Sequence, residues 1–416
     1  MKKEKTPNIR FKKFEHNWFK DCLSKVSNSI EYGLNASAKD FDGIHKYLRI
    51  TDIDDSSRLF LTDKLSSPDV NFTEEDYENY KLRINDLLFA RTGASVGKTY
   101  LYRESDGEVY YAGFLIRARL HDSYDGNFIF QQTLTDKYKQ FIEITSQRSG
   151  QPGVNGKEYG DWKIGMTSYP EQSAIGSLFR TLDELLASYK NNLANYQSLK
   201  VTMLSKMFPK AGQTVPEVRL NGFEGEWKVQ ALKELASFSK GNGYTKNDLV
   251  NSGKEIILYG RLYTNYQTVI SKVNTFVTTV KINTVISKGG EVIVPASGET
   301  AEDISRASVV KKSGIILGGD LNIIYPDENK VNSIFLALTI SNGSQQKELI
   351  KRAQGKSVVH LRNNDLEKVV LHYPSMEEQR AISTYFSNLD DLISDHQEKI
   401  SQLETLKKKL LQDMFI

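Results

Sequence analysis

"EQSAIGSLFRTLDELLASYKNNLANYQSLKVTMLSKMF", residues 171–208, returns in altered form as "EQRAISTYFSNLDDLISDHQEKISQLETLKKKLLQDMF", residues 378–415. The two segments align without a gap at an offset of 207 residues, and 13 of their 38 positions are identical, several times more than chance gives. An internal repeat on this scale predicts that the chain contains two copies of one structural unit.

Apolar side chains recur in both segments at alternating steps of three and four residues, which is typical of a coiled-coil seam. Lys200, His396 and Lys407 interrupt the seam. We expect His396 to pack within it and both lysines to lie where it opens to solvent. The seam residues are Ile175, Phe179, Leu182, Leu186, Leu193, Ile382, Phe386, Leu389, Ile393, Ile400 and Leu403.

Two helices with such seams can cover each other's apolar stripes, so we expect an antiparallel pair within the chain. Each helix would be about 55 Å long at 1.5 Å per residue. Two variable domains would then sit at opposite ends of a rod, related by a pseudo-twofold axis. The alternative is that each helix packs only on its own domain.

The blocks ahead of the two helices also correspond. A Tyr-Pro pair precedes each helical segment, at 169–170 and at 373–374. At an offset of 209, Pro7, Ile9, Arg10, Phe14 and Trp18 match Pro216, Val218, Arg219, Phe223 and Trp227. The predicted fold is α+β with a pseudo-twofold internal repeat. Its parts are a first domain (1–167), a first helix (168–208), a linker with Pro and Gly (209–216), a second domain (217–372) and a second helix (373–416).

Composition favours a soluble globular protein of two or three domains. The chain has 416 residues, 39% apolar and 26% charged, with a net charge of +3 and no apolar run long enough for a membrane span. One cysteine, Cys22, excludes an internal disulfide, and the six histidines lack metal-binding spacing. We therefore expect a cytoplasmic protein. Residues 1–167 hold 25 basic and 25 acidic side chains, so a DNA-binding face would have to gather its basic groups locally.

The stretch "ARTGASVGKT", residues 90–99, ends like a phosphate-binding P-loop. A P-loop needs four residues between its two glycines, whereas three separate Gly93 from Gly97, and the residues after Lys98 favour a strand rather than a helix. A P-loop-like nucleotidase is therefore only an alternative. Because no methyltransferase motif, nucleophile elbow or metal cluster stands out, we expect a scaffold with two binding domains.

The sequence resembles the specificity subunit of type I restriction–modification enzymes. The resemblance rests on the P-x-I-R-F…F…W opening, "DLLFARTGASVGK", Tyr-Pro followed by Glu-Gln-x-Ala-Ile, and the helix ending Leu-x-x-Met-Phe, nearly all of them present twice. In one departure, Glu171 directly follows Pro170, whereas three residues separate Pro374 from Glu378. This difference would let the first helix enter at another angle.

The resemblance implies two target recognition domains, each reading one half of a split, asymmetric sequence in double-stranded DNA. The helices would space these domains and dock two modification subunits, which bind S-adenosylmethionine and methylate adenine. Restriction subunits would add ATP- and Mg-dependent translocation and cleavage, so this chain would carry no catalytic, cofactor-binding or metal-binding residue. Other possibilities are a related system with a fused modification and cleavage partner, or a coiled-coil adaptor without a nucleic-acid role.

The first candidate DNA contact is the turn at Arg91 and Thr92, followed by Lys98. Arginine can bind guanine with two hydrogen bonds or hold a phosphate, although an exposed arginine on a structural turn explains the pattern equally well. The predicted counterpart in the second half, residues 295–300, has no arginine. The shared role of the turn is therefore expected to be structural.

Two further stretches mix glycine, basic and amide residues, or basic and aromatic residues, as DNA contacts do. A solvated loop or a half-buried strand would explain them as well. The second candidate is residues 145–157, with Arg148, Gln151, Asn155 and Lys157, and its repeat partner 350–360, with Arg352, Gln354 and Lys356. The third is residues 239–246 and 257–267, with Lys240, Tyr244, Lys246, Arg261 and Tyr263.

Overall fold

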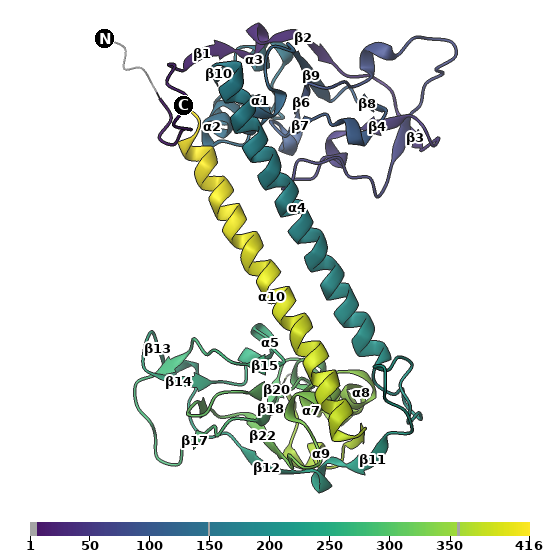
Figure 1. The fold of residues 1–416 in the computed structure, drawn as a ribbon, viewed down its shortest axis with the longest axis vertical. Helices are drawn as coiled ribbons and strands as arrows, with labels where there is room; N and C mark the ends of the chain where they lie inside the picture. The colour runs from purple at the N-terminus through teal and green to yellow at the C-terminus, as the bar shows by residue number, and fades with distance from the viewer. Residues whose placement is uncertain (1–5, 149, 356–357) are drawn as a thin grey trace. The chain divides into compact units, whose positions relative to one another are not determined.

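The computed structural model describes residues 6–148, 150–355 and 358–416 and divides into two compact units (Figure 1). Unit 1 comprises residues 1–191 and 398–416, and unit 2 comprises residues 192–397. Two helices of 38 residues, α4 (Tyr169–Lys206) and α10 (Met376–Asp413), contribute to both units. Within the described ranges, no helix is long and apolar enough to cross a membrane.

Unit 1 is built around an antiparallel sheet with strand order β2-β9-β6-β7. The apolar run of β6 is buried on both sides, because Leu87 and Phe89 face one hydrophobic cluster while Leu88 and Ala90 face another. The elements are β1 (Phe19–Cys22), β2 (Ser27–Tyr32), β3 (Ala38–Asp40), β4 (Lys46–Leu48), β5 (Ser66–Pro68), β6 (Asp86–Ala90), β7 (Thr99–Leu101), β8 (Val109–Tyr111), β9 (Leu115–Leu120), β10 (Lys163–Met166), α1 (Gly126–Gln132), α2 (Asp136–Thr145) and α3 (Gly156–Gly160).

Unit 2 contains two five-stranded sheets, ordered β12-β22-β18-β20-β15 and β13-β16-β14-β21-β17. The elements are β11 (Lys228–Ala231), β12 (Ala236–Lys240), β13 (Leu249–Val250), β14 (Lys254–Ile257), β15 (Val269–Ile270), β16 (Phe276–Val277), β17 (Val285–Ile286), β18 (Glu291–Pro295), β19 (Ser297–Gly298), β20 (Ser308–Val310), β21 (Ile316–Leu317), β22 (Leu321–Pro326), β23 (Val359–His360), β24 (Val370–Tyr373), α5 (Arg261–Thr264), α6 (Ala301–Ile304), α7 (Ser333–Ile340), α8 (Gly343–Arg352) and α9 (Asn363–Leu366).

The repeat found in the helices extends to the sheets. The order β12-β22-β18-β20 in unit 2 repeats β2-β9-β6-β7 in unit 1, and the pair β11-β24 repeats β1-β10. The parallel pair β4-β8 of unit 1 likewise repeats β14-β21 of unit 2, and the antiparallel pair β3-β5 repeats β13-β16, whereas β15 extends the first sheet of unit 2 beyond the shared order. Each unit therefore combines a shared frame with its own additions.

Contacts within each unit confirm that α4 and α10 pair antiparallel, and Figure 1 shows the two helices side by side. In unit 1, Lys190 Nζ lies 2.7 Å from Glu404, and Asp183, earlier in α4, binds a later residue of α10. In unit 2, the rings of Tyr196 and His396 lie 5.2 Å apart, so His396 packs in the seam as predicted. The eleven predicted seam residues are all buried or half-buried.

The prediction that Lys200 and Lys407 lie where the seam opens to solvent is wrong. Their side chains are only 20% and 18% exposed, because each forms an ion pair with an aspartate of the other helix. Lys200 binds Asp390, and Lys407 Nζ lies 2.5 Å from Asp183. The two lysines lie 207 residues apart, and so do the two aspartates. The two ion pairs are therefore equivalent under the internal repeat.

The predicted correspondence of the two Tyr-Pro pairs is also wrong. Tyr169 already belongs to α4, whereas Tyr373 ends β24. At the offset of 207, the counterpart of Tyr373 is Met166, which ends β10. Both helices begin at equivalent positions, Tyr169 and Met376, so the extra residues in the second half do not shift the start of the helix.

The repeated Glu-Gln pair joins each helix to the opening block of its own unit. Arg10 donates two hydrogen bonds to Glu171, at 2.5 and 2.7 Å, and Arg219 donates two to Glu378, both at 2.7 Å. Burial raises the pKa of Glu171, but hydrogen bonds from Arg10 and Thr167 lower the pKa by more than burial raises it. The pKa of Glu171 therefore lies below its usual value. This two-pronged, charge-assisted geometry explains why arginine and glutamate recur together in both repeats.

The Met-Phe at the end of each long helix closes the aromatic core of one unit. In unit 1, the ring of Phe415 lies 6.3 Å from Trp18 and 5.5 Å from Phe128, between ring centroids. In unit 2, Phe208 lies 6.1 Å from Trp227. Phe415 belongs to the second repeat and Phe208 to the first, so each repeat supplies an aromatic ring to the core built mainly by the other.

Candidate nucleic-acid interface

Two of the predicted DNA-contacting stretches of unit 1 meet at the end of β6. As predicted, the turn after β6 lies between two strands, β6 and β7. Arg91 accepts a hydrogen bond at its carbonyl from the Val154 backbone N–H (2.9 Å), and the Gly93 N–H donates to the Pro152 carbonyl (3.0 Å). These bonds fix the turn against the 145–157 loop, so both stretches form one surface.

The Arg91 side chain is held by two exposed aromatic rings. Its guanidinium carbon lies 5.1 Å from the ring centroid of Tyr32 and 5.9 Å from that of Phe114, whose side chains are 45% and 61% exposed. Arg91 Nε is buried without a hydrogen-bond partner among the described residues. Because cation–π contacts orient a guanidinium without occupying its N–H donors, the two rings fix the direction of the Arg91 side chain and leave its donors unused by the rings.

The remaining candidates of the loop lie on the same surface but differ in whether their side chains already form hydrogen bonds within the chain. Arg148 donates to Glu158 at 2.5 Å and to two backbone carbonyls. Asn155 caps α3, since its side-chain oxygen accepts from the Glu158 N–H at 2.9 Å. Gln151 and Lys157 are exposed. The loop thus presents amide and cationic groups next to Arg91.

Lys98 and the glycines before it do not form a phosphate cradle. Lys98 is 9% exposed, donates to the Ile53 carbonyl at 3.0 Å and lies 2.5 Å from Asp55. The next residues form β7 instead of a helix. This arrangement turns the ammonium group inward and sets Lys98 apart from the surface that Arg91 and the loop present.

Unit 2 repeats the backbone of this surface with other side chains. The Ala296 N–H donates to the Asp320 carbonyl at 2.8 Å, and the Leu361 N–H donates to the Ala296 carbonyl at 3.0 Å. The same two bonds surround Arg91 in unit 1, from Arg91 to Phe114 and from Val154 to Arg91. Alanine therefore stands in unit 2 where unit 1 has its arginine.

The other candidates of this loop in unit 2 vary in their surroundings. Arg352 lies 2.6 Å from Glu348 on the same helix, α8. Gln354 is exposed and pairs through its backbone with His360. Lys356 lies outside the described residues. The two units consequently offer different chemistry on a shared support.

The third stretch separates into exposed lysines and structural side chains. Lys240 and Lys246 are exposed, whereas Tyr244 is only 6% exposed. Arg261 donates to Asn274, Gln267 and the Lys272 carbonyl at 2.9–3.1 Å, which joins the ends of its own loop.

Residues 261–264 form the short helix α5, not the half-buried strand that the sequence left open, and half-buried Tyr263 lies in it, 6.2 Å from Tyr259 between ring centroids.

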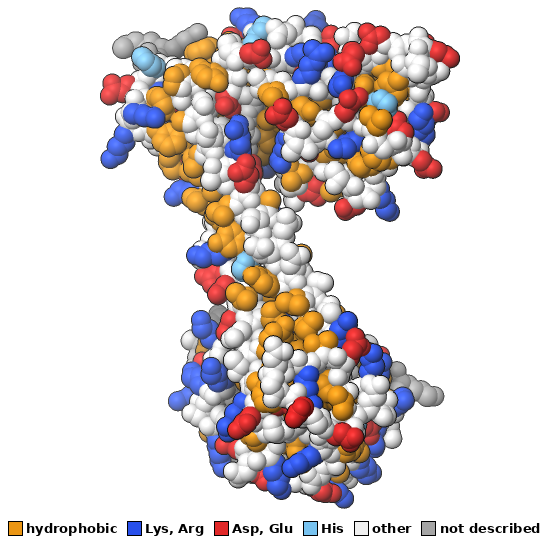
Figure 2. Space-filling model, turned by 45° about the vertical axis from the view of Figure 1, so that its right-hand side comes forward, with side chains coloured by type: hydrophobic (Ala, Val, Ile, Leu, Met, Phe, Trp, Pro, Cys, Tyr) orange, Lys and Arg blue, Asp and Glu red, His pale blue; other side chains and the backbone are white. Residues whose placement is uncertain are grey.

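Sequence reasoning missed Tyr32 and Phe114. They lie far from Arg91 in the chain, and only the pairing of β9 with both β2 and β6 brings them beside it. No local motif marks either residue. Nor does charge mark the site, because basic and acidic side chains are intermingled over each unit on the face drawn in Figure 2.

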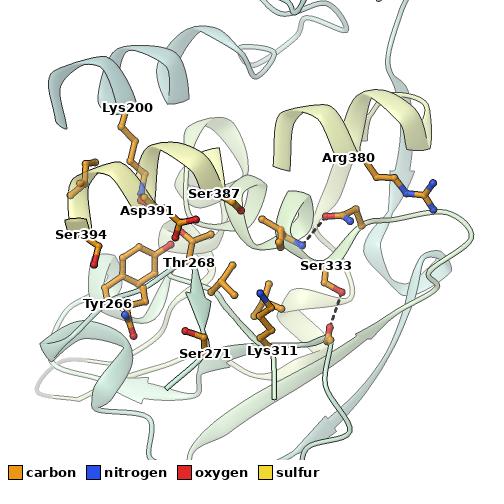
Figure 3. A pocket seen from close by; sticks show the side chains of 18 of the residues that line it. Lys200, Tyr266, Thr268, Ser271, Lys311, Ser333, Arg380, Ser387, Asp391 and Ser394 are labelled. Atoms are coloured by element: carbon orange, nitrogen blue, oxygen red, sulfur yellow. Dashed lines mark hydrogen bonds and ion pairs between the residues drawn. The ribbon is translucent and has the colours of Figure 1, made fainter. Parts of the chain in front are cut away.

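Unit 2 also contains a polar groove of about 1000 Å³ between α10 and the edge strand β15 (Figure 3). Tyr266, Thr268 and Ser271 line it from the β15 segment, and Ser387 and Asp391 line it from α10. Lys200, Lys311 and Arg380 add positive charge to the negative charge of the aspartates, so the groove does not favour one sign of ligand. Across residues 6–148, 150–355 and 358–416, no group of three potential metal ligands is found.

Comparisons with known proteins agree with this architecture. Residues 224–405 match the family model described as the type I restriction modification DNA specificity domain. The chain is similar to the type I restriction enzyme MjaVIII specificity subunit of Methanocaldococcus jannaschii, with 20% identity over 385 residues that cover 90% of this chain and 85% of the relative. The putative MjaX specificity subunit of that organism is 21% identical over 407 residues, covering 94% and 90%.

A solved structure shares the fold. The crystal structure of the type I restriction–modification system S subunit from M. genitalium matches with a TM-score of 0.65 and 15% identity, covering 99% of both chains. Over residues 224–405 the chain thus matches the type I restriction modification DNA specificity domain, and over nearly its whole length it is similar to specificity subunits of type I restriction enzymes.

Proposed function

We propose that this chain is the DNA-recognition subunit of a type I restriction–modification complex and that each unit reads one half of a bipartite target. The observation that carries the proposal is Arg91, whose guanidinium is held by Tyr32 and Phe114 and whose Nε has no hydrogen-bond partner among the described residues. Arginine with free N–H donors is the side chain best suited to guanine O6 and N7 in the major groove.

The two halves of the target differ in this proposal. Arg91 of unit 1 is replaced by Ala296 in unit 2, although the backbone support is the same. Two unlike readers on one chain select an asymmetric target, whereas a homodimer selects a palindrome. The long helices space the readers, and the number of unread base pairs depends on helix length.

Exposed leucines on the long helices support the docking of two similar partner subunits. Leu185 of α4 and Leu392 of α10 are 41% and 39% exposed, and the offset of 207 relates them. Leu199 and Leu406, 39% and 44% exposed, are related in the same way. Exposed apolar residues repeated at matching positions fit two copies of one protein, which we propose to be modification subunits. S-adenosylmethionine, ATP and Mg would be bound by partner subunits.

Co-expression with a modification partner, followed by mapping of methylated adenines, tests this function. A motif with two specified halves and an unspecified gap is expected. Substituting Arg91→Ala should relax one guanine in one half only, at a cost of about 1–3 kcal/mol in discrimination. Arg83→Ala is the control, since Arg83 is a 60% exposed arginine of unit 1 outside the candidate surface. Methylation without a split motif, or relaxation in both halves, would contradict the proposal.

A further inference from the structure

The loop between β16 and β17 in unit 2, residues 278–284, carries a very exposed apolar side chain. Ile282 is 91% exposed, more than any other large hydrophobic side chain of the described residues, and Val280 beside it is 50% exposed. Single exposed apolar residues are common and need no explanation by themselves. The contacts that hold this loop, and the charges around it, give Ile282 a more specific meaning.

The Tyr244 side chain anchors the loop by hydrogen bonds to its backbone. Its hydroxyl accepts a hydrogen bond from the Lys281 N–H at 2.7 Å and donates to the Thr279 carbonyl at 3.2 Å. Asn242 donates from its side-chain amide to the Asn283 carbonyl, also at 3.2 Å. Tyr244 has a left-handed backbone angle, φ of 57°, which a bulky side chain adopts only where surrounding contacts impose it. Tertiary contacts therefore hold the backbone on both sides of Ile282, at Lys281 and Asn283.

Exposed lysines lie on the segments that contact this loop. Lys240 and Lys246 are exposed on the segment that carries Tyr244, and exposed Lys254 lies opposite Val277 in the β14–β16 ladder, at the base of the loop. Lys281 lies over the Tyr244 ring at 4.6 Å and is paired with Asp248. Figure 1 places β13, β14 and β17 at the edge of the unit, away from α10.

An apolar tip with a cationic rim matches the chemistry of a DNA duplex. The duplex carries its negative charge on the outer phosphates and its apolar stacking surface between the base pairs. Architectural DNA-binding proteins use isoleucine, leucine or phenylalanine in this way, as wedges that separate neighbouring base pairs and bend the duplex.

We propose that Ile282 inserts between two adjacent base pairs of the half-site read by unit 2, while Lys240 and Lys246 bind the flanking phosphates. This inference rests on the proposed function and adds a second means of recognition to it. Part of the sequence preference of unit 2 then comes from how easily a base-pair step unstacks, and flexible pyrimidine–purine steps are favoured at that position.

The test uses the full-length chain and a duplex selected from a random pool for binding to it. Each base of the protected region is replaced in turn by 2-aminopurine, whose fluorescence rises when a base unstacks. Wild-type protein should raise the fluorescence at one step of one half-site. Ile282→Ala should abolish that rise while affinity falls by less than about tenfold. Ile44→Ala, at a 62% exposed position in unit 1, is the matched control and should change neither quantity.

A double variant, Lys240→Ala with Lys246→Ala, separates the rim from the tip. It should weaken binding to all duplexes alike. The slope of the logarithm of the binding constant against the logarithm of salt concentration should become less steep by about two, one for each lost phosphate contact. An unchanged fluorescence rise with Ile282→Ala, or no rise with wild type on a bound duplex, would overturn the wedge and leave the DNA-recognition function standing.

Two other results would also overturn the inference. If the lysine variant bound DNA normally but lost binding to vesicles rich in phosphatidylglycerol, the tip would be a lipid-binding element. If the selection yielded no bound duplex at all, the proposed function would fail together with the wedge.

Discussion

Removing the ring of Phe415 should destabilise unit 1, although Phe415 lies near the C-terminus of the chain. Phe415 is 4% exposed and touches the rings of Trp18, Phe128 and Phe179 at 5.5–6.3 Å between centroids. Truncating a buried phenylalanine to alanine costs about 3–5 kcal/mol, because transfer free energy is lost and a cavity remains. A native domain is stable by only about 5–15 kcal/mol, so Phe415→Ala should remove a large part of the stability of unit 1.

Hydrogen exchange followed by mass spectrometry measures this loss for each unit separately. Amides of the central strand β6 should lose protection by a factor of about 10²–10³·⁵, which corresponds to 3–5 kcal/mol. Amides of β18 in unit 2 should keep theirs, since Phe415 belongs to the core of unit 1. The repeat-related variant Phe208→Ala should give the reverse pattern.

Phe19→Ala serves as the control for this experiment. Its side chain is 52% exposed, so the free energy of unfolding should change by less than about 0.5 kcal/mol. If Phe415→Ala left the protection of β6 unchanged, the ring would not be an integral part of the core. Equal losses in both units would show instead that the units unfold as one, and the assignment of each terminal ring to a single core would be refuted.

The other predictions concern the long helices. Replacing exposed Leu185 and Leu406 by glutamate should reduce the stoichiometry of bound modification subunits from two to one in native mass spectrometry, without loss of folding by circular dichroism; retention of two would contradict the proposed docking surface. Because the pKa of Glu171 is below its usual value, its ionised form stabilises unit 1 at neutral pH, and this stabilisation is lost as pH falls below the ordinary carboxyl pKa of 4.5 towards the lower folded value. Urea unfolding of Glu171→Gln should therefore show a weaker dependence on pH in this range than wild type, and an unchanged dependence would refute the reasoning. Lys407→Ala should lower the free energy of unfolding by about 1–2 kcal/mol, a value between those of surface and buried ion pairs, because the pair with Asp183 is partly buried. A double-mutant cycle with Asp183→Ala should give a favourable coupling energy between the two side chains, and additive effects would show that the pair does not interact.

The order of residues by itself was enough to establish the long helices and their pairing. Coiled-coil spacing is local and periodic, so residues such as Phe179 and Phe386 reveal a buried stripe without any knowledge of the fold. The repeat then implies that the same solution occurs twice. The strand before the Arg91 turn could be predicted equally well, because its apolar run and the β-favouring residues after Lys98 are local signals.

The same periodicity could not say what Lys200 and Lys407 do. A lysine in a seam indicates an interruption, but whether an aspartate of the other helix reaches it depends on the register of the pair. Nor could local spacing assign the Tyr-Pro pairs, since similar dipeptides can occupy different positions relative to a helix start. For the two lysines the sequence specifies the residue type, but the ion-pair partner lies more than 180 residues away on the other helix.

The candidate interface was decided by tertiary structure almost entirely. Sequence marked Arg91 and Lys98 as neighbours of similar charge, yet the fold leaves the first half-buried between Tyr32 and Phe114 and buries the second near Asp55. Side chains alternate between the faces of a sheet, and strand pairing joins residues from distant parts of the chain, so short-range patterns cannot tell which groups will meet. The two long helices can therefore be predicted from the periodicity of the sequence, whereas the candidate surface around Arg91 forms only once the strands have paired.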